Sequence, residues 1–273
     1  MNFKLKVLKK IGLIILIFLT SKDIFSQTVE EIYYQLPDKY LKTCPLAWLA
    51  EKKYEDYSDN KSDEKFDRIK LKRILHIPLE KLNDEKPGHF DPMSGSYIQT
   101  RLIDNKNGYI KFCDGGCTWE FVMKLFNSKN TKQKYIAIWS GDNDGATSGT
   151  NKELYVLEVV KNKSIISFKD VTTELKPSIT VKEAVGTSMY NKYKKSMEKD
   201  FPGDPLFDRF ELDRYKRIII GYINNSGMLF YPLWDSNSKI KIKEMEIIDK
   251  VITNKKIAFK WNDNKFIRIN KAD

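Results

Sequence analysis

The spacing of apolar and polar positions changes near residue 96. Before it, Thr28 and Glu31 have the spacing of a capping box, which predicts a short helix. Pro45 fits the first turn of a second helix. Residues 68–77 alternate in polarity, but a helix fits them equally well. The N-terminal part, residues 27–95, is therefore predicted to be helical or irregular.

After residue 96 the apolar positions recur every second residue, as in β-strands with one buried face. Polar turns separate the runs, and Asn107-Gly108 is a typical hairpin pair. This spacing predicts an antiparallel meander of hairpins over residues 96–273. The expected strands are 96–103, 109–113, 118–126, 134–140, 153–160, 165–171, 211–223, 228–234, 239–248, 255–261 and 265–269.

A single long helix interrupts the strands at about 181–199. Thr180 and Glu183 again form a capping box, and Gly186 lies inside the helix at a cost of ~1 kcal/mol relative to alanine. An apolar stripe recurs every four residues and is expected to pack on the sheet: Val181, Val185, Met189, Tyr193 and Met197. The predicted fold class is α+β, mainly antiparallel sheet, with a helical N-terminal part and this one amphipathic helix.

The first 26 residues have the layout of a secretory signal peptide. Residues 1–10 are basic, residues 11–19 are apolar, and a polar end follows. Cleavage is expected after Ser26, which leaves Gln27 first; an uncleaved signal anchor is the alternative. The nine-residue apolar run is too short for a ~30 Å bilayer core, and no later run approaches ~18 residues. The mature chain is thus predicted to be one exported domain, periplasmic or secreted, without a stable membrane span.

Charge argues against a nucleic-acid partner. The chain has 48 basic and 37 acidic residues, a formal charge of +11, and loss of residues 1–26 lowers this to +7. The charges are interspersed, whereas nucleic-acid binding favours basic residues clustered with aromatics on one face. A lysine-rich solvated surface is the simpler interpretation.

Cys113 and Cys117 bracket a glycine-containing turn between strand-like segments, so we expect a disulfide that closes a hairpin. Free thiols, or a redox or metal site, are the alternatives. Export favours the disulfide, because thiols pair in an oxidising compartment. The third cysteine, Cys44, precedes the predicted helix start at Pro45 and is expected to be a buried free thiol.

Candidate chemistry is sparse. Asp142 and Asp144 lie in a glycine-bounded loop that could offer oxygen ligands to calcium, but the full calcium-loop pattern is not met and a plain turn is preferred. Glu120 alternates with apolar neighbours and is expected to face solvent. His76 is expected to be a hydrogen-bonded core or edge residue, and His89 to lie in a surface turn. The sequence matches none of the common nucleophile, zinc or phosphate-loop motifs, so no catalytic residue and no cofactor is predicted.

Two functions remain. The first is a non-catalytic binding or interaction protein of the cell envelope, whose partner is another envelope protein or a polysaccharide. The alternative is an envelope hydrolase acting on polysaccharide or peptide through carboxylates, which are plentiful. A cleft with two facing carboxylates would favour the enzyme, and an exposed apolar or aromatic patch would favour binding.

Overall fold

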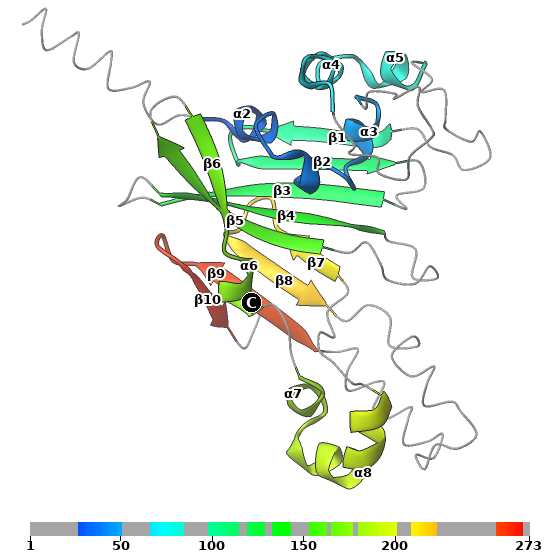
Figure 1. Cartoon of the computed structure of the whole chain (residues 1–273), viewed down its shortest axis with the longest axis vertical. Helices are drawn as coiled ribbons and strands as arrows, with labels where there is room; N and C mark the ends of the chain where they lie inside the picture. The colour runs from blue at the N-terminus through cyan, green and yellow to red at the C-terminus, as the bar shows by residue number, and fades with distance from the viewer. Residues whose placement is uncertain are drawn as a thin grey trace, which may run out of the picture.

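Two antiparallel β-sheets dominate the computed structural model (Figure 1). It describes residues 27–50, 66–84, 98–114, 119–128, 133–142, 153–162, 165–176, 180–200, 209–222 and 255–269. The first sheet has the order β1-β2-β3-β4-β5-β6, so every strand pairs with its neighbour in the chain and the predicted meander is confirmed. Its strands are β1 (Ile98–Asp104), β2 (Tyr109–Asp114), β3 (Trp119–Asn127), β4 (Lys134–Asp142), β5 (Glu153–Asn162) and β6 (Ile165–Asp170).

Strand β3 is buried on both faces, which explains its nearly continuous apolar sequence. Phe121 and Met123 point to one face and pack with the N-terminal helices. Val122 and Phe126 point to the other face and pack with the second sheet. The six-stranded sheet is therefore the middle layer of three.

The second sheet has the order β10-β9-β8-β7. Its strands are β7 (Arg209–Leu212), β8 (Ile218–Tyr222), β9 (Lys256–Trp261) and β10 (Phe266–Ile269). The expected single strand 211–223 is wrong, because Asp213 accepts hydrogen bonds from the backbone N–H groups of Tyr215 and Lys216 and turns the chain into a hairpin. The β9–β10 hairpin is confirmed, with Asp263 at a positive φ of 75° in its tip. Expected strands 228–234 and 239–248 lie outside the described residues.

Short helices cover the other face of the six-stranded sheet (Figure 1). They are α2 (Val29–Tyr33), the 3-10 helix η1 (Asp38–Tyr40), α3 (Pro45–Trp48), α4 (Arg68–Ile74) and α5 (Leu79–Asp84). The capping box of Thr28 and Glu31 is confirmed. Residues 68–77, for which the sequence allowed either a strand or a helix, begin with the helix α4. The Asp67 carboxylate caps this helix by accepting hydrogen bonds from the first-turn N–H groups of Ile69 and Lys70.

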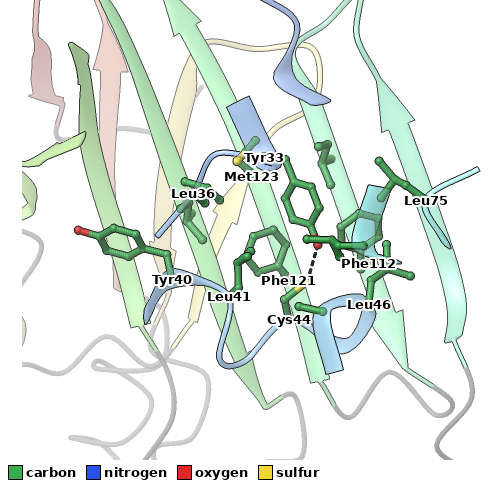
Figure 2. Packing of buried hydrophobic residues seen from close by; sticks show 14 of the residues in the cluster. Tyr33, Leu36, Tyr40, Leu41, Cys44, Leu46, Leu75, Phe112, Phe121 and Met123 are labelled. Carbon is green, nitrogen blue, oxygen red and sulfur yellow. Dashed lines mark hydrogen bonds between the residues drawn. The ribbon is translucent and has the colours of Figure 1, made fainter. Parts of the chain in front are cut away.

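The helices meet the sheet through aromatic packing (Figure 2). The ring of Tyr33 lies edge-on to Phe112 and Phe121, with centroid separations of 5.4 and 5.9 Å. The Tyr33 hydroxyl lies 3.3 Å from the Cys44 sulfur. Burial raises the pKa of the Cys44 thiol to about 12, so the thiol stays protonated at neutral pH. Cys44 is a buried free thiol, as expected.

The predicted helix over 181–199 is two helices. The remaining helices are α6 (Thr172–Leu175), α7 (Val181–Val185) and α8 (Thr187–Asp200). Gly186 has a φ of 87°, which is incompatible with a continuous right-handed helix. The capping box of Thr180 and Glu183 is confirmed.

The expected stripe of this segment is only partly described. Val185 is buried, and Met189 packs against the layer between the sheets while staying partly exposed. The side chains of Val181, Tyr193 and Met197 lie outside the described residues. Overall, the fold is mostly antiparallel sheet with a few short helices, consistent with the predicted class.

Candidate functional site

A lysine and a glutamate are buried between the sheets. Lys124 and Glu120, both on β3, are 4% and 5% exposed. The Lys124 amine donates hydrogen bonds to the backbone carbonyls of Asn107, at 2.8 Å, and Arg214, at 2.5 Å. Glu120 pairs with Lys111 on the adjacent strand. The expectation that Glu120 faces solvent is therefore wrong, because the second sheet covers the face on which it lies.

An ion pair joins a turn of each sheet. Asp104, at the end of β1, accepts hydrogen bonds from the Arg214 guanidinium at 2.6 and 2.7 Å. It also accepts hydrogen bonds from the backbone and the side-chain amide of Asn107. These Asn107 hydrogen bonds, and then Arg214, lower the pKa of Asp104 to about 2. The carboxylate thus stays charged over the physiological range and holds both turns in place.

The β1–β2 turn has four residues, 105–108, and Asn107-Gly108 does not form the type I′ pair that is typical of hairpins. Asn107 does not have a positive φ, whereas Gly108 has a φ of 61°. A Cβ at Gly108 would lie 2.9 Å from the Cβ of Leu125, so a side chain would clash there as well as strain the backbone. This close approach lets the turn lie against β3 and form one wall of a pocket.

The pocket has a volume of about 320 Å³ and lies where this turn meets the start of α2 and the adjoining ends of β3 and β4. Its lining is mostly polar: Gln27, Thr28, Asn105, Lys106, Asn107, Gly108, Leu125, Asn127 and Lys134. The Lys134 amine donates a hydrogen bond to the Gln27 carbonyl at 3.4 Å. Burial lowers the pKa of Lys134, and the nearby cation of Lys161 lowers it further, while Glu31 opposes them. The pocket therefore offers amide, hydroxyl and ammonium groups in one place.

A cluster of titratable side chains adjoins the pocket through Asn105. One Glu30 oxygen accepts a hydrogen bond from the Tyr34 hydroxyl at 2.8 Å and lies 3.0 Å from the His76 Nε2. Asn105 donates a hydrogen bond to the other oxygen at 3.2 Å. Burial, followed by Glu30, raises the pKa of Tyr34, so its hydroxyl keeps its proton. A carboxylate beside an imidazole can accept and pass on a proton.

The exposure of this cluster weakens that chemistry. His76 is hydrogen-bonded, as expected. Its side chain is 62% exposed, however, so it lies at the surface and not in the core. Catalytic pairs gain from exclusion of water, which strengthens their electrostatic interactions. The Glu30 cluster therefore has the residue types of an acid–base pair in a solvated setting.

The other predicted residues are only partly described. Asp142 ends β4, but its side chain and the whole of Asp144 lie outside the described residues. Within the described part, no three His, Cys, Asp or Glu side chains are grouped so that they could hold a metal ion. Ser26 and His89 also lie outside the described residues.

The cysteine pairing is likewise incomplete. Cys113 is buried at the end of β2. Cys117 lies outside the described residues, so the predicted pairing of these two cysteines stays a prediction.

The pocket was missed by sequence reasoning, although four of its lining residues were named for other reasons: Gln27, Thr28, Asn107 and Gly108. Asn105 and Asn107 read as ordinary turn residues, and Asn127 and Lys134 as strand ends. Their positions at neighbouring ends of consecutive strands are a usable signal, because antiparallel pairing brings such ends together. The sequence gave no sign that Gln27 and Thr28, at the start of α2, lie beside these strand ends.

Comparison with known proteins does not assign the chain to a family. No protein-family model matches it, and no curated protein or solved structure does so either. Among the helices of the described segments, none has the length and apolar composition needed to cross a bilayer. The function must therefore be argued from the pocket and its surroundings.

Proposed function

We propose that the protein is exported and acts as a non-catalytic binding protein of the cell envelope, with the polar pocket as its ligand site. The observation that supports this proposal is the polar lining of the pocket, in which Leu125 is the one large apolar side chain. Its volume of about 320 Å³ falls at the small end of the usual range for ligand sites. A sugar residue at the end of an envelope polysaccharide is the proposed ligand.

The charge of the pocket favours an acidic sugar. Lys106 and Lys134 bring two ammonium groups, and Thr28, Asn105 and Asn127 can exchange hydrogen bonds with hydroxyls. Hydrogen bonds between ammonium and carboxylate groups are roughly twice as strong as neutral ones. A uronic acid would therefore bind more tightly than the corresponding neutral hexose.

Titration of the purified protein with glucuronic acid and with glucose, followed by calorimetry or NMR, tests the ligand site. Lys134→Gln should weaken uronic-acid binding by roughly ten-fold or more, the loss expected for one charge-assisted hydrogen bond. Lys169→Gln, on the exposed edge of β6, is the matched control and should leave binding unchanged. Equal affinity for the two sugars, or equal effects of the two substitutions, would exclude this pocket as an acidic-sugar site.

The alternative, an envelope hydrolase, has one observation in its favour: the Glu30, His76 and Tyr34 cluster. It predicts slow hydrolysis of polysaccharide or peptide substrates that Glu30→Gln abolishes. The same protein preparation can be assayed for released reducing ends and free amines. Turnover that depends on Glu30 would replace the binding proposal with the enzymatic one.

Export itself is tested by the mass of the protein recovered from the periplasm or the medium. Cleavage after Ser26 gives a chain that begins with Gln27, in its open or cyclised form. A secreted chain that retains residues 11–19 would support the uncleaved anchor instead.

A further inference from the structure

Strand β6 is the least protected edge of the two sheets (Figure 1). Among the described strands, the other edges are β1, β7 and β10. Strand β1 has a register shift between Ile98 and Thr100 and contacts α5, and both features protect an edge. Strands β7 and β10 have only four residues each. Strand β6 has six residues, pairs with β5 without a register shift, and has no further strand beside it within the described segments.

The backbone groups of β6 point alternately towards β5 and away from it. Val171, directly after the strand, donates its backbone N–H to the carbonyl of Val156 on β5. Hydrogen-bonded and non-hydrogen-bonded pairs alternate along antiparallel strands. Ser167 therefore bonds to β5, whereas the N–H and C=O groups of Ile166 and Phe168 point outwards. The outer edge thus offers hydrogen-bonding groups to a further strand.

The side chains of β6 give the edge one apolar and one polar face. Ile166 and Phe168 are partly buried and pack against the helix-side core. Ser167 and Lys169 are exposed and lie on the opposite face, because successive side chains of a strand alternate. A strand added at this edge would therefore extend the apolar layer on the helix side and leave the other face solvated.

We infer that β6 pairs antiparallel with β6 of a second copy of this chain, with Ser167 on the twofold axis. In this register Ile166 lies opposite Phe168 of the second copy, and the symmetry repeats this pair. An aromatic ring opposite a β-branched side chain is a favourable cross-strand pair. Both residues have outward backbone groups, so each pair also exchanges N–H···O=C hydrogen bonds.

Other registers are less complementary. A register centred on Phe168 would place Ile166 opposite the carboxylate of Asp170. One centred on Lys169 would place two ammonium groups opposite each other, which is destabilising. One centred on Ile166 would leave Phe168 beyond the end of the second strand. The edge is therefore complementary to its own copy in the register centred on Ser167, and this self-complementarity favours a second copy over an unrelated strand. The inference is independent of the proposed sugar site.

Hydrogen exchange at two protein concentrations tests the pairing. Analytical ultracentrifugation of the mature exported protein over a concentration series first locates the dimer. Above its dissociation constant, the amides of Ile166 and Phe168 should exchange about ten-fold more slowly than below it, because they gain hydrogen bonds to the second copy. The amide of Ile267, on β10, is the control and should change by less than two-fold.

A charge placed on the axis should separate the two copies. Ser167→Lys puts two lysines opposite each other and should raise the dissociation constant of the dimer roughly ten-fold or more. Ile267→Lys adds the same charge at a 42% exposed position of β10 and should leave the constant within two-fold of the wild type. Both positions are exposed, and circular dichroism checks that both variants are folded.

Oxidative cross-linking tests the register. On the axis, Ser167 would form a non-hydrogen-bonded pair with its copy, whose Cα atoms lie about 4.5 Å apart, within the range of a disulfide. Ser167→Cys should therefore give a covalent dimer on a non-reducing gel. Lys169→Cys is the control, because its two copies would lie about 13 Å apart along the strands. The wild type gives the background from the native cysteines.

Four results would overturn the inference. The first is a monomer at every concentration, and the second is an equal effect of Ser167→Lys and Ile267→Lys. The third is slow exchange of Ile166 and Phe168 at all concentrations, which would mean that another segment of the same chain covers the edge. The fourth is faster cross-linking of Lys169→Cys than of Ser167→Cys, which would place the axis elsewhere.

Discussion

The two faces of the six-stranded sheet are covered by different means. On the helix side, the contact is made by fully buried apolar and aromatic groups such as Tyr33, Phe112 and Phe121. On the side of the second sheet, apolar packing is joined by buried charges, with Lys124 and Glu120 among them. The sheet–sheet layer therefore includes buried charges that need ionic or hydrogen-bonded partners, whereas the helix layer includes neutral polar contacts such as the hydrogen bond from the Ser140 hydroxyl to the Thr43 carbonyl.

The difference shows how the N-terminal helices and the second sheet are each held on the six-stranded sheet. The N-terminal helices have only three to seven residues and are too short to be stable alone, so apolar burial holds them in place. The second sheet is additionally tied by directional contacts between turns. Arg217 bonds to Asp263 and to the carbonyl of Asn127, which also accepts a hydrogen bond from the Trp261 indole at 3.3 Å. Such contacts fix which residues face one another, beyond what apolar packing requires.

The largest effect is expected from a cavity in the helix-side core. Phe121→Ala should lower the free energy of unfolding by about 3–5 kcal/mol, because this fully buried ring packs on Phe112 and Tyr33. Urea denaturation measures the change. Val160→Ala, at a 40% exposed position of β5, is the control and should stay within about 0.5 kcal/mol of the wild type. Comparable losses in both variants would mean that the helices do not cover this face.

The next largest effect should come from the buried cation between the sheets. Lys124→Met keeps the side-chain volume but leaves the carbonyls of Asn107 and Arg214 without their donor. We expect a loss of about 2–3 kcal/mol, measured by urea denaturation, since unsatisfied buried carbonyls are costly. Lys169→Met, on exposed β6, is the control. An unchanged or raised stability would show that apolar packing alone specifies the sheet–sheet layer.

A smaller effect is expected at the ion pair of the two turns. Asp104→Asn should cost about 1–2 kcal/mol at neutral pH, because Arg214 loses its charged partner and is itself partly exposed. The folded-state pKa of Asp104 is lowered from 3.8 to about 2. The stabilisation is thus fully present above about pH 4 and is lost as the pH falls towards 2. Chemical denaturation between pH 5 and pH 2 should show a weaker acid dependence in the variant, and parallel curves would contradict this.

A still smaller effect is expected from the one polar contact drawn within the helix-side core of Figure 2. Tyr33→Phe removes the hydroxyl beside the Cys44 sulfur and should cost about 0.5–1.5 kcal/mol, the net value of a neutral hydrogen bond. Thermal unfolding measures it. A loss as large as that of Phe121→Ala would mean that the contact, rather than ring packing, holds α2 on the sheet.

No effect is expected from calcium. The loop that contains Asp142 and Asp144 is predicted to be structural, with water and backbone groups around its carboxylates. Melting curves in calcium and in chelator should coincide. A real site at a calcium level of ~100 Kd would add about 2.7 kcal/mol, and a shift abolished by Asp144→Ala would make calcium a cofactor.

Local patterns were sufficient for much of the fold. Thr28 with Glu31 and Thr180 with Glu183 both cap helices as predicted, because a capping box involves residues three apart and is independent of the rest of the chain. The meander followed from period-two apolar positions for the same reason. The pattern alone did not separate helix from strand at residues 68–77, where the Asp67 cap favoured the helix.

Tertiary structure decided the rest. Period two shows that Glu120 and Phe121 face opposite sides of β3, but it cannot show that both sides are covered. The pocket forms because the start of α2 lies beside a turn some 80 residues later in the chain, and the Asp104–Arg214 pair spans 110 residues. Local spacing determines how a segment folds, since its causes lie within a few residues. Which surfaces meet depends on the burial and pairing of groups remote in sequence, and only the folded chain brings these together.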